Sequence, residues 1–563
     1  MEKRFVENKR AYELYVKTPL LKALIKIIIP GLLISLMMGI YWFVDQILIA
    51  RLVPHDGVHT CENIFGYSEE TIKSWIKQVD PSLIFYGPGE VIKTAITISS
   101  PISLVLLCMP FFISTGTGII FTQAIGKNNR EKGYESYKMG FWTTTTIGLL
   151  MTFIFGVFCT QILTSMAGKE VVVKGEGDIV NKLNEYYHTV HTTQIKYAHD
   201  FIFILSLGPV LPCLINLFSV LIRAEGRLLF PTLISIAANI VNVLLDFLLI
   251  WYAKRGMQSG GIATFSGWVI NLTALLCYIY YLNKKKKFTW IHFRTLSLFN
   301  NVKLNFKLYA PINLLGLSGF LTDFTYSIAM MVYLPILSQT CIDINVAGGG
   351  EYFMTISAGV LPIMNLLFAT MWGIVDGSRP INSYNYAICN FKRIKKTYWY
   401  TIFISFTFAL ICFGFISGIR IQVLQLFEIN KSMMHDAYIY LVIDLLLLPT
   451  FSFQVSGILL FQGTNNILRA NIASILQDVI VYYPTLFILR LICVASDNIW
   501  ILIPTYVISA SISSILMTIY CSWYVNKRLG FTKIKAKIND KFMTFFVPTK
   551  IQKMSIAEKA LDY

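Results

Sequence analysis

Charged side chains are scarce in this 563-residue chain, and their scarcity excludes a soluble globular protein. Asp, Glu, Lys and Arg together make up 14% of the residues, against about 25% in soluble domains. The hydrophobic fraction is 55% and the mean hydropathy is +0.60. The apolar residues gather in runs of ~20 or more, long enough to face lipid across a bilayer. The same composition also excludes intrinsic disorder and a coiled coil.

Cysteines and enzyme motifs are equally sparse. Most of the ten cysteines fall within apolar runs, where thiols behave as small hydrophobic groups. Only Cys61 and Cys341 fall in connections predicted on the outer side, so at most one external disulfide is expected. The chain contains no GxxxxGK[ST] nucleotide-binding loop, no HExxH motif and no DDxxD box. We therefore expect a membrane protein that is not an enzyme and carries no cofactor.

Twelve apolar stretches are long enough to span a membrane. They lie near residues 24–50, 94–125, 139–165, 200–222, 229–251, 259–282, 308–338, 351–378, 397–418, 434–461, 471–489 and 499–524. The polar N-terminus has no small-residue cleavage site, so the first stretch is predicted to be a retained span. Prolines inside the stretches predict kinked or broken helices, at Pro30, Pro101, Pro212, Pro362 and Pro449.

The basic residues indicate the orientation. The net charge is +17, and most Lys and Arg fall in connections that lie inside if the N-terminus is inside. This asymmetry is typical of cytoplasmic loops and gives both termini a cytoplasmic location. It also accounts for the basic excess without nucleic acid as a partner. We expect a multi-pass, monomeric protein of a bacterial cell membrane, with membrane lipid around it.

The two halves of the chain repeat a set of landmarks in the same order. Pro101 and Pro362 are each followed at equal spacing by Gly116 and Gly377, then by Asn129 and Asn390; Pro212 and Pro449 are likewise followed by Gly226 and Gly463. The predicted fold is therefore all-α integral membrane, with twelve transmembrane helices in two six-helix lobes related by a pseudo-twofold axis. The predicted boundaries are an N-lobe at 1–282 with outer insertions 51–93 and 166–199, a basic cytoplasmic linker at 283–307, a C-lobe at 308–525 and a basic cytoplasmic tail at 526–563.

Five aspartates lie well inside predicted spans rather than at their ends, where an ionisable group costs ~2.5–3.5 kcal/mol at mid-bilayer and is a functional candidate. They are Asp45, Asp246, Asp323, Asp444 and Asp478. Asn242 precedes Asp246 by one helical turn on the same face, and Thr264 follows in the next span. Such carboxylates either take up a proton or coordinate a hard cation with amide and hydroxyl oxygens. Hydrogen bonding between helices is the alternative interpretation.

Histidines cluster in the two outer insertions. His55 and His59 lie beside Cys61, and His188 and His191 lie in the second insertion. These residue types could form an external metal site. Scattered polar loop residues are the better account, so no metal site is predicted firmly.

Several short elements, in order, resemble the multidrug and toxic compound extrusion (MATE) family from about Tyr15 to Lys527. They are Pro30, Asp45 and Arg51 in the first span, RAEG (223–226), NVLLD (242–246), GGIATF (260–265) and RPINSYNYA (379–387) followed by NFKR. The resemblance implies an antiporter in which inward-moving H⁺ or Na⁺ drives organic, often cationic or amphipathic, compounds outward by alternating access.

The resemblance also implies residue roles. It gives the coupling site as Asp45, Asn242, Asp246 and Thr264, and it suggests a possible second-lobe acidic site at Asp323 and Asp444. Asp376 adds an acid near the cytoplasmic end of the eighth span, and neither it nor Asp478 is assigned a role.

Three alternatives to multidrug efflux remain open at this stage. A lipid or lipid-linked substrate flippase of the same superfamily would favour a basic central cavity. A membrane-embedded enzyme would need a clustered metal or nucleophile motif. A receptor-like or structural protein would use the outer insertions as its working part.

Overall fold

The computed structural model describes residues 8–53, 57–80, 83, 85–167, 172–297, 302, 304–346, 349–425 and 433–529, and every regular element within them is helical. The first half contains α1 (Lys9–Tyr12), a π turn η1 (Glu13–Lys17), α2 (Leu20–Leu52), α3 (Cys61–Phe65), α4 (Glu69–Val79), α5 (Pro88–Lys127), α6 (Arg130–Met166), α7 (Asp178–Ser206), α8 (Val210–Ala224), α9 (Leu229–Trp251) and α10 (Gln258–Lys284).

A linker with α11 (Phe293–Leu296) and the 3₁₀ turn η3 (Phe306–Leu308) leads to the second half. That half contains α12 (Tyr309–Asp343), α13 (Gly349–Ala387), α14 (Phe391–Gly418), α15 (Arg420–Gln425), α16 (Met434–Leu445), α17 (Leu447–Gly463), α18 (Ile467–Ile475), a π turn η4 (Leu476–Val481), α19 (Tyr482–Ser496), η5 (Ile499–Ile501), α20 (Thr505–Trp523) and a π turn η6 (Tyr524–Arg528).

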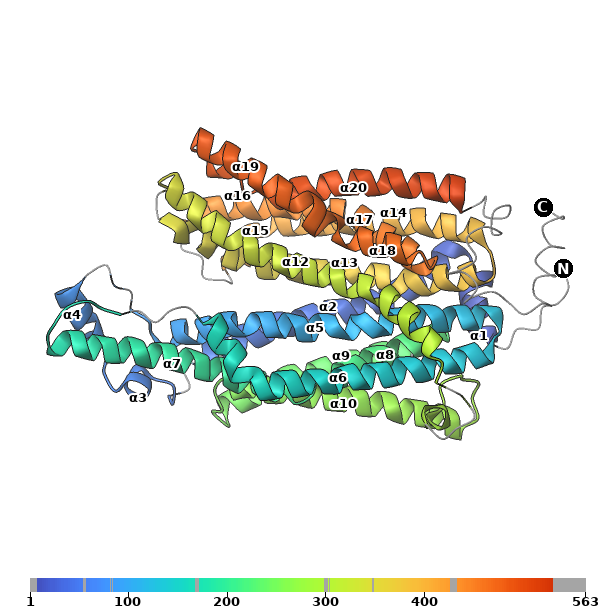
Figure 1. Ribbon diagram of the computed structural model, residues 1–563, viewed down its shortest axis with the longest axis horizontal. Coiled ribbons are helices and arrows are strands. Elements are labelled where there is room, and N and C mark those ends of the chain that lie inside the picture. The colour runs from blue at the N-terminus through green and yellow to red at the C-terminus, as the bar shows by residue number, and fades with distance from the viewer. Residues whose placement is uncertain are drawn as a thin grey trace.

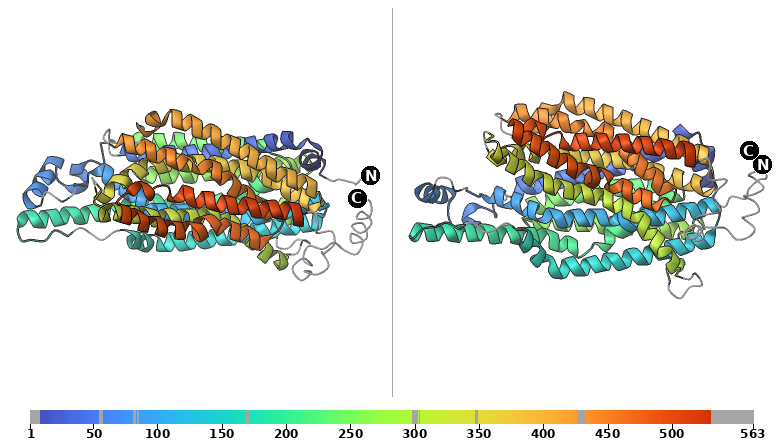
Figure 2. Two further views of the ribbon diagram at one scale, coloured as in Figure 1. Left: turned by 90° about the horizontal axis from the view of Figure 1, so that it is seen from above. Right: turned by 45° about the horizontal axis from the view of Figure 1, so that its top comes forward.

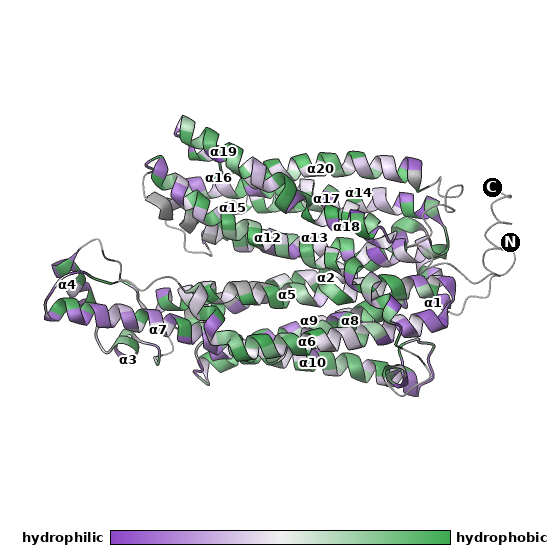
Figure 3. Cartoon of the chain, viewed as in Figure 1, coloured by the Kyte–Doolittle hydropathy of each residue, from purple (hydrophilic) through white to green (hydrophobic). Residues whose placement is uncertain are grey.

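The helices form two bundles that lie side by side with their axes along the long dimension of the molecule (Figures 1 and 2). Eleven helical segments in the described chain are long and apolar enough to cross a membrane, and α7 with α8 makes a twelfth that is bent by 45°. Hydrophobic residues dominate these segments, whereas α3, α4 and the start of α7 are mixed (Figure 3). The twelve-span, all-α prediction is confirmed.

Prolines break two of the spans and leave others continuous. The bend between α7 and α8 lies at Leu207–Pro209, and the break between α16 and α17 lies at Leu446. Each break comes a few residues before a proline, Pro212 or Pro449, whose missing N–H removes one helical hydrogen bond. By contrast, α2 continues through Pro30, and α13 continues through Pro362. The external disulfide does not form, because Cys341 is buried in α12 and all ten thiols are free.

The repeat of the two halves is visible in the turns that follow α5 and α13. Asn128 and Cys389 both adopt positive φ, at 57° and 60°. The next residues, Asn129 and Asn390, cap α6 and α14 by accepting backbone N–H groups with their side chains. Asparagine favours this N-cap position, so the two landmark asparagines have one structural role in both halves.

Glycines bring the two lobes into backbone contact. A Cβ on Gly31 of α2 would lie 2.5 Å from the carbonyl oxygen of Gly373 in α13, and a Cβ on Gly316 of α12 would lie 1.4 Å from that of Phe112 in α5. Gly373 and Gly377 have the small-xxx-small spacing that lets membrane helices approach closely. Gly31 and Gly316 lie in the first half of α2 and α12, and Gly373 lies in the second half of α13. We call the end of the bundle at which α1 lies the α1 end (Figure 1).

The N-terminal segment ties the lobes together at the α1 end. The Tyr15 hydroxyl donates to the Arg223 carbonyl of the first lobe. The Tyr15 carbonyl accepts from the Asn385 amide of the second lobe at 3.0 Å, and Thr18 accepts from Arg393 at 2.7 Å. The segment therefore acts as a bridge between lobes that are joined in sequence only by the linker.

At the opposite end, α3, α4 and the first turns of α7 project beyond the bundle (Figures 1 and 2). Their packing is apolar: Ile72 and Ile76 of α4 are buried in one cluster with Phe65, Leu183 and Tyr186. The second outer insertion is therefore largely an amphipathic extension of the α7 helix. A search for continuous apolar runs begins this span too late, because only one face of the extension is apolar.

Candidate functional site

The structure brings the four residues of the predicted coupling site together from three helices of the first lobe. Asp45 lies on α2, Asn242 and Asp246 lie one turn apart on α9, and Thr264 lies on α10. All four are buried, with Asp246 fully inaccessible and Asp45 7% exposed. The Asn242 amide donates to the Thr264 hydroxyl at 3.3 Å. The carboxyls of Asp45 and Asp246 lie within hydrogen-bonding reach of each other.

Oxygen atoms without a donor face this site. Asp45 Oδ1, both carboxylate oxygens of Asp246 and Asn242 Oδ1 are buried and accept no hydrogen bond from the described residues. Two carboxylates in a low-dielectric interior repel each other, so the pair cannot hold two bare negative charges. A shared proton or a small cation between them would relieve this repulsion.

Two glycines make room for the site. A Cβ on Gly260 of α10 would lie 3.1 Å from Asp45 Oδ1 and 2.5 Å from Ile49 Cδ1. A Cβ on Gly267 would lie 3.3 Å from Cβ of Asn242. The small-residue start of α10 therefore lets that helix lie directly against the acidic pair.

The second-lobe aspartates are arranged differently from the first-lobe pair. Asp323 on α12 is half-buried, and its charged neighbours are Asp376, Asp478 and Arg379. Asp444 on α16 is 9% exposed and lies near tyrosine rings, those of Tyr326, Tyr333 and Tyr440. No contact between Asp323 and Asp444 joins them into one site in the described chain.

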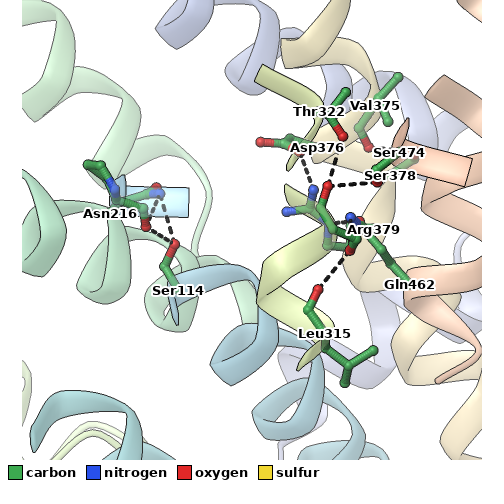
Figure 4. A network of polar contacts seen from close by, with 12 residues as sticks. Ser114, Asn216, Leu315, Thr322, Val375, Asp376, Ser378, Arg379, Gln462 and Ser474 are labelled. Carbon is green, nitrogen blue, oxygen red and sulfur yellow. Dashed lines mark hydrogen bonds and ion pairs between the residues drawn. The ribbon is translucent and has the colours of Figure 1, made fainter. Parts of the chain in front are cut away.

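A basic residue lies inside the eighth span, where sequence reasoning placed none. Arg379 is eight residues before the end of α13 and is 9% exposed. Its guanidinium forms a 2.6 Å ion pair with Asp376 and donates from Nε to Gln462 at 3.1 Å (Figure 4). Gln462 in turn donates to the Ser318 hydroxyl at 2.9 Å. The apolar run ends before Arg379 but the helix does not, because the arginine has this network inside the protein.

A pocket between the lobes is lined by both acidic and basic side chains. It is lined by residues of α2, α5, α8 and α13, including Arg223, Asp376 and Arg379. Arg223 comes from the first lobe and Arg379 from the second. Both lie toward the α1 end, where the glycine contacts close the lobes on each other.

The external histidines form no metal centre within the described part of the chain, where no three His, Cys, Asp or Glu side chains gather. The ring of His59 packs edge-on against Tyr197. His188 and His191 lie on α7, and His55 is outside the described residues.

Uncharged polar partners were missed by sequence reasoning. Gln462, Gln477 and Tyr506 each contact a charged side chain inside the second lobe. None belongs to a motif with a fixed spacing. Their one sequence signal is a large polar side chain within an apolar run, and that signal is shared by many lipid-facing tyrosines.

A family model described as MatE matches residues 69–248 and 327–487, which together are more than half of the chain. The chain belongs to the MatE family. The match covers parts of both lobes, including Asn242 and Asp246. It makes the protein a membrane transporter rather than an enzyme, as the sequence elements predicted.

Similar proteins show how the MatE assignment extends over the chain. An uncharacterised protein of Mycoplasmoides gallisepticum is 27% identical over 91% of this chain and 90% of its own length, and one of Mycoplasma genitalium is 26% identical over 91% and 93%. A solved outward-facing MATE family transporter of the MOP superfamily superimposes with a TM-score of 0.71 at 16% identity, covering 92% of this chain and 98% of its own.

Another solved structure bears on the charge of the binding pocket. It is a MOP superfamily transporter from Pyrococcus furiosus, described by a reverse polarity of its binding pocket that suggests a different function. It superimposes with a TM-score of 0.69 at 18% identity, covering 92% of this chain and 98% of its own. At this identity the likeness shows a common fold and no common substrate.

Proposed function

We propose that this MatE protein is a cation-coupled antiporter that exports organic, cationic or amphipathic compounds. The observation that carries the proposal is the facing pair Asp45 and Asp246, whose buried oxygens have no donor. A site that requires one positive charge to relieve its repulsion is suited to binding H⁺ or Na⁺. An ionisable group in a membrane span is, by default, part of an ion pathway.

The arrangement of the lobes supports an alternating-access cycle. The glycine contacts and the Tyr15 bridge hold the lobes together at the α1 end, which the basic-residue bias places in the cytoplasm. In this state, substrate leaves toward the opposite side, and a cation enters Asp45 and Asp246 from there. Neutralising the pair removes the repulsion between α2 and α9, which changes their packing and favours substrate release.

The energy is adequate for export. One elementary charge moving across 100 mV supplies ~2.3 kcal/mol. Since 1.4 kcal/mol corresponds to about tenfold in an equilibrium constant, one cation exchanged for an uncharged compound supports a substrate gradient of more than tenfold. For a monovalent cation such as ethidium, one-for-one exchange is electroneutral, so the concentration gradient of the coupling ion supplies the energy.

The test uses purified protein in liposomes loaded with ethidium, with a pH gradient or a Na⁺ gradient imposed separately. Wild type should move ethidium under one gradient, and Asp45→Asn and Asp246→Asn should each abolish that movement. Asp497→Asn is the matched control, because Asp497 is exposed at the end of α19 with positive φ, a conformation that asparagine tolerates. Gradient-driven movement that survives in well-folded Asp45→Asn protein would rule out the proposed coupling site.

A second candidate function, lipid or lipid-linked substrate flipping, is favoured by one observation. The interlobe pocket is lined by two guanidinium groups, Arg223 and Arg379, and one carboxylate, Asp376, which pairs with Arg379 and also acts on Arg223. The excess positive charge would attract a phosphate-bearing head group. Transfer of a fluorescent phospholipid between leaflets, lost in Arg379→Gln and independent of ion gradients, would support this function in place of drug antiport.

A further inference from the structure

A groove lies at the α1 end, where the start of α2 meets the start of α14. Its volume is about 850 Å³, and it is lined by Leu20 of the first lobe and by Asn390 and the first turns of α14 in the second. Nη2 of Arg393, another lining residue, donates to the Thr18 carbonyl at 2.7 Å. The groove therefore lies beside the N-terminal segment that bridges the two lobes.

The lining of this groove is basic. Lys392, Arg393, Lys395 and Lys396 all fall within the first six residues of α14, and no carboxylate is among the described residues that line the groove. The amino end of a helix carries a partial positive charge, which disfavours cations there. A cytoplasmic bias of basic residues explains on which side of the membrane these four lie, but not why they gather around one groove. A negatively charged ligand would offset their mutual repulsion.

One of the basic side chains has a donor without an acceptor. Nε of Arg393 is buried and makes no hydrogen bond within the described chain, although Nη2 is bonded to Thr18. Buried polar atoms normally find partners. A guanidinium group matches the oxygens of a phosphate in charge and geometry, so the groove offers donors suited to a phosphate.

Aromatic side chains continue the groove along the membrane span. Trp399, Tyr400 and Phe403 line it and are 41%, 39% and 66% exposed, on a helix that is long and apolar enough to cross the membrane. At 1.5 Å per residue, Trp399 lies about 10 Å beyond Lys392 along α14. Trp and Tyr are enriched at the boundary between lipid head groups and acyl chains. The groove thus changes from basic to aromatic in the order in which a phospholipid changes from head group to chain.

We propose that this groove binds one anionic phospholipid of the cytoplasmic leaflet. The lipid phosphate accepts hydrogen bonds from the basic side chains at the start of α14, and the acyl chains lie along Leu20, Trp399 and Phe403. The side of the membrane follows from the basic-residue bias, which places the α1 end in the cytoplasm. Anionic lipids attract basic residues at that surface.

Bound lipid would contact both lobes, since Leu20 belongs to the first and α14 to the second. It would therefore add to the contact between Thr18 and Arg393 that joins the lobes at the α1 end. This lipid site depends neither on the coupling ion nor on the exported compound, so it can fail while the antiport proposal stands.

The experiment measures which lipid lies beside Trp399 in the full-length protein. Purified protein is placed in phosphatidylcholine nanodiscs that contain a minority of phosphatidylglycerol, with bromine on the acyl chains of one lipid or the other. Bromine quenches tryptophan fluorescence at short range. The difference between each protein and the same protein with Trp399→Phe isolates Trp399 from the other tryptophans, ten in all. Brominated phosphatidylglycerol should quench Trp399 several-fold more than its mole fraction predicts.

Paired lysine variants test the charge of the groove. A basic residue near an anionic leaflet contributes about fivefold in affinity, so Lys392→Gln with Lys396→Gln should lower the affinity for phosphatidylglycerol about 25-fold. Lys392→Arg with Lys396→Arg should retain it, because the charges and donors remain. The matched control is Lys284→Gln with Lys285→Gln, which removes two exposed lysines at the end of α10, outside the groove, and should also retain it.

Three results would overturn the proposal. The first is equal quenching of Trp399 by the two brominated lipids in the wild type. The second is an equal loss in the groove variant and in the control variant, because basic charge anywhere on this side would then suffice. The third is displacement of the brominated lipid by excess glycerol 3-phosphate, because the groove would then recognise a phosphate without acyl chains.

Discussion

At the scale of single residues, unpaired buried oxygens mark the places where this protein has more polar groups than its own donors satisfy. Asp45, Asp246 and Asn242 have such oxygens in the first lobe, and Gln477 has one in the second. Each lies next to a carboxylate within a membrane span. An unsatisfied buried acceptor costs roughly 1–3 kcal/mol, and a cation bound between Asp45 and Asp246, as we propose, would offset that cost.

Thr264 tests whether the neutral members of the first-lobe site take part in ion binding. Its hydroxyl accepts from the Asn242 amide and so fixes the orientation of that side chain. Thr264→Val should weaken the apparent affinity for the coupling ion about tenfold, and Thr264→Ser should restore it. The measurement is the ion concentration that gives half-maximal ethidium transport. An unchanged half-maximal concentration in Thr264→Val would show that the Thr264 hydroxyl has no part in ion binding.

Glu225 offers a pH-dependent prediction outside the spans. Burial raises the pKa of this carboxyl from 4.5 to about 7, although hydrogen bonds from the Trp290 backbone and the Thr289 hydroxyl oppose the shift. Because the folded-state pKa exceeds the unfolded value, the contribution of Glu225 to stability is fully present below 4.5 and is lost as pH rises through about 7.

The corresponding experiment compares Tm across that pH window for wild type and Glu225→Gln. The glutamine cannot ionise, so its Tm should fall less than that of wild type between the two pKa values. Both proteins carry the other titrating groups, which therefore cancel in the difference. If Tm changed with pH by the same amount in both proteins, the raised pKa of Glu225 would be contradicted.

At the scale of elements, close helix contacts decide how the lobes meet. Gly316 of α12 lies against the Phe112 carbonyl of α5, where an added Cβ would come within 1.4 Å. Gly316→Ala should force the helices apart and lower the free energy of unfolding by ~1–3 kcal/mol. Gly414→Ala is the matched control, because nothing lies within 4 Å of a Cβ at that position in α14.

The readout for this pair is Tm in detergent together with the transport rate. Gly316→Ala should lower both, and Gly414→Ala should leave both near wild type. Similar behaviour of the two alanine variants would show that the interlobe glycine contact contributes nothing specific.

The elements also show what sequence could and could not predict. Apolar runs predict the twelve spans. Ionisable side chains inside those spans, together with short motifs, predict the first-lobe residues Asp45, Asn242, Asp246 and Thr264. The structure brings those four residues together. The π turn at Asp478 could not be predicted, because a wide turn leaves no signature in composition. The helical start of α7 was missed because burial of one face against α3 and α4 depends on tertiary contacts.

Arg379 illustrates a further limit. A charge at the edge of an apolar run normally ends the span, and here the helix continues because Asp376 and Gln462 satisfy the guanidinium. Such compensation involves a residue on α17, 83 positions away in the chain. Periodicity and hydropathy are local properties, so they carry no information about a partner at that separation.

At the scale of the whole molecule, the two lobes form one transporter, with the buried pair Asp45 and Asp246 in the first lobe. The lobes are in contact at the α1 end through glycines and the N-terminal segment. Membership of the MatE family makes the protein a membrane transporter. Beyond that membership, we propose that ion movement through Asp45 and Asp246 is coupled to substrate movement in the opposite direction.

Reciprocal flux tests this claim most directly. Liposomes containing the protein are given an outward ethidium gradient and no ion gradient, and H⁺ and Na⁺ movements are recorded with separate indicators. Coupled exchange predicts that ethidium leaving the liposomes drives one of these ions inward, and that Asp45→Asn abolishes the ion movement while Asp497→Asn retains it. Ethidium efflux without any counter-movement of H⁺ or Na⁺ in the wild-type protein would contradict the account.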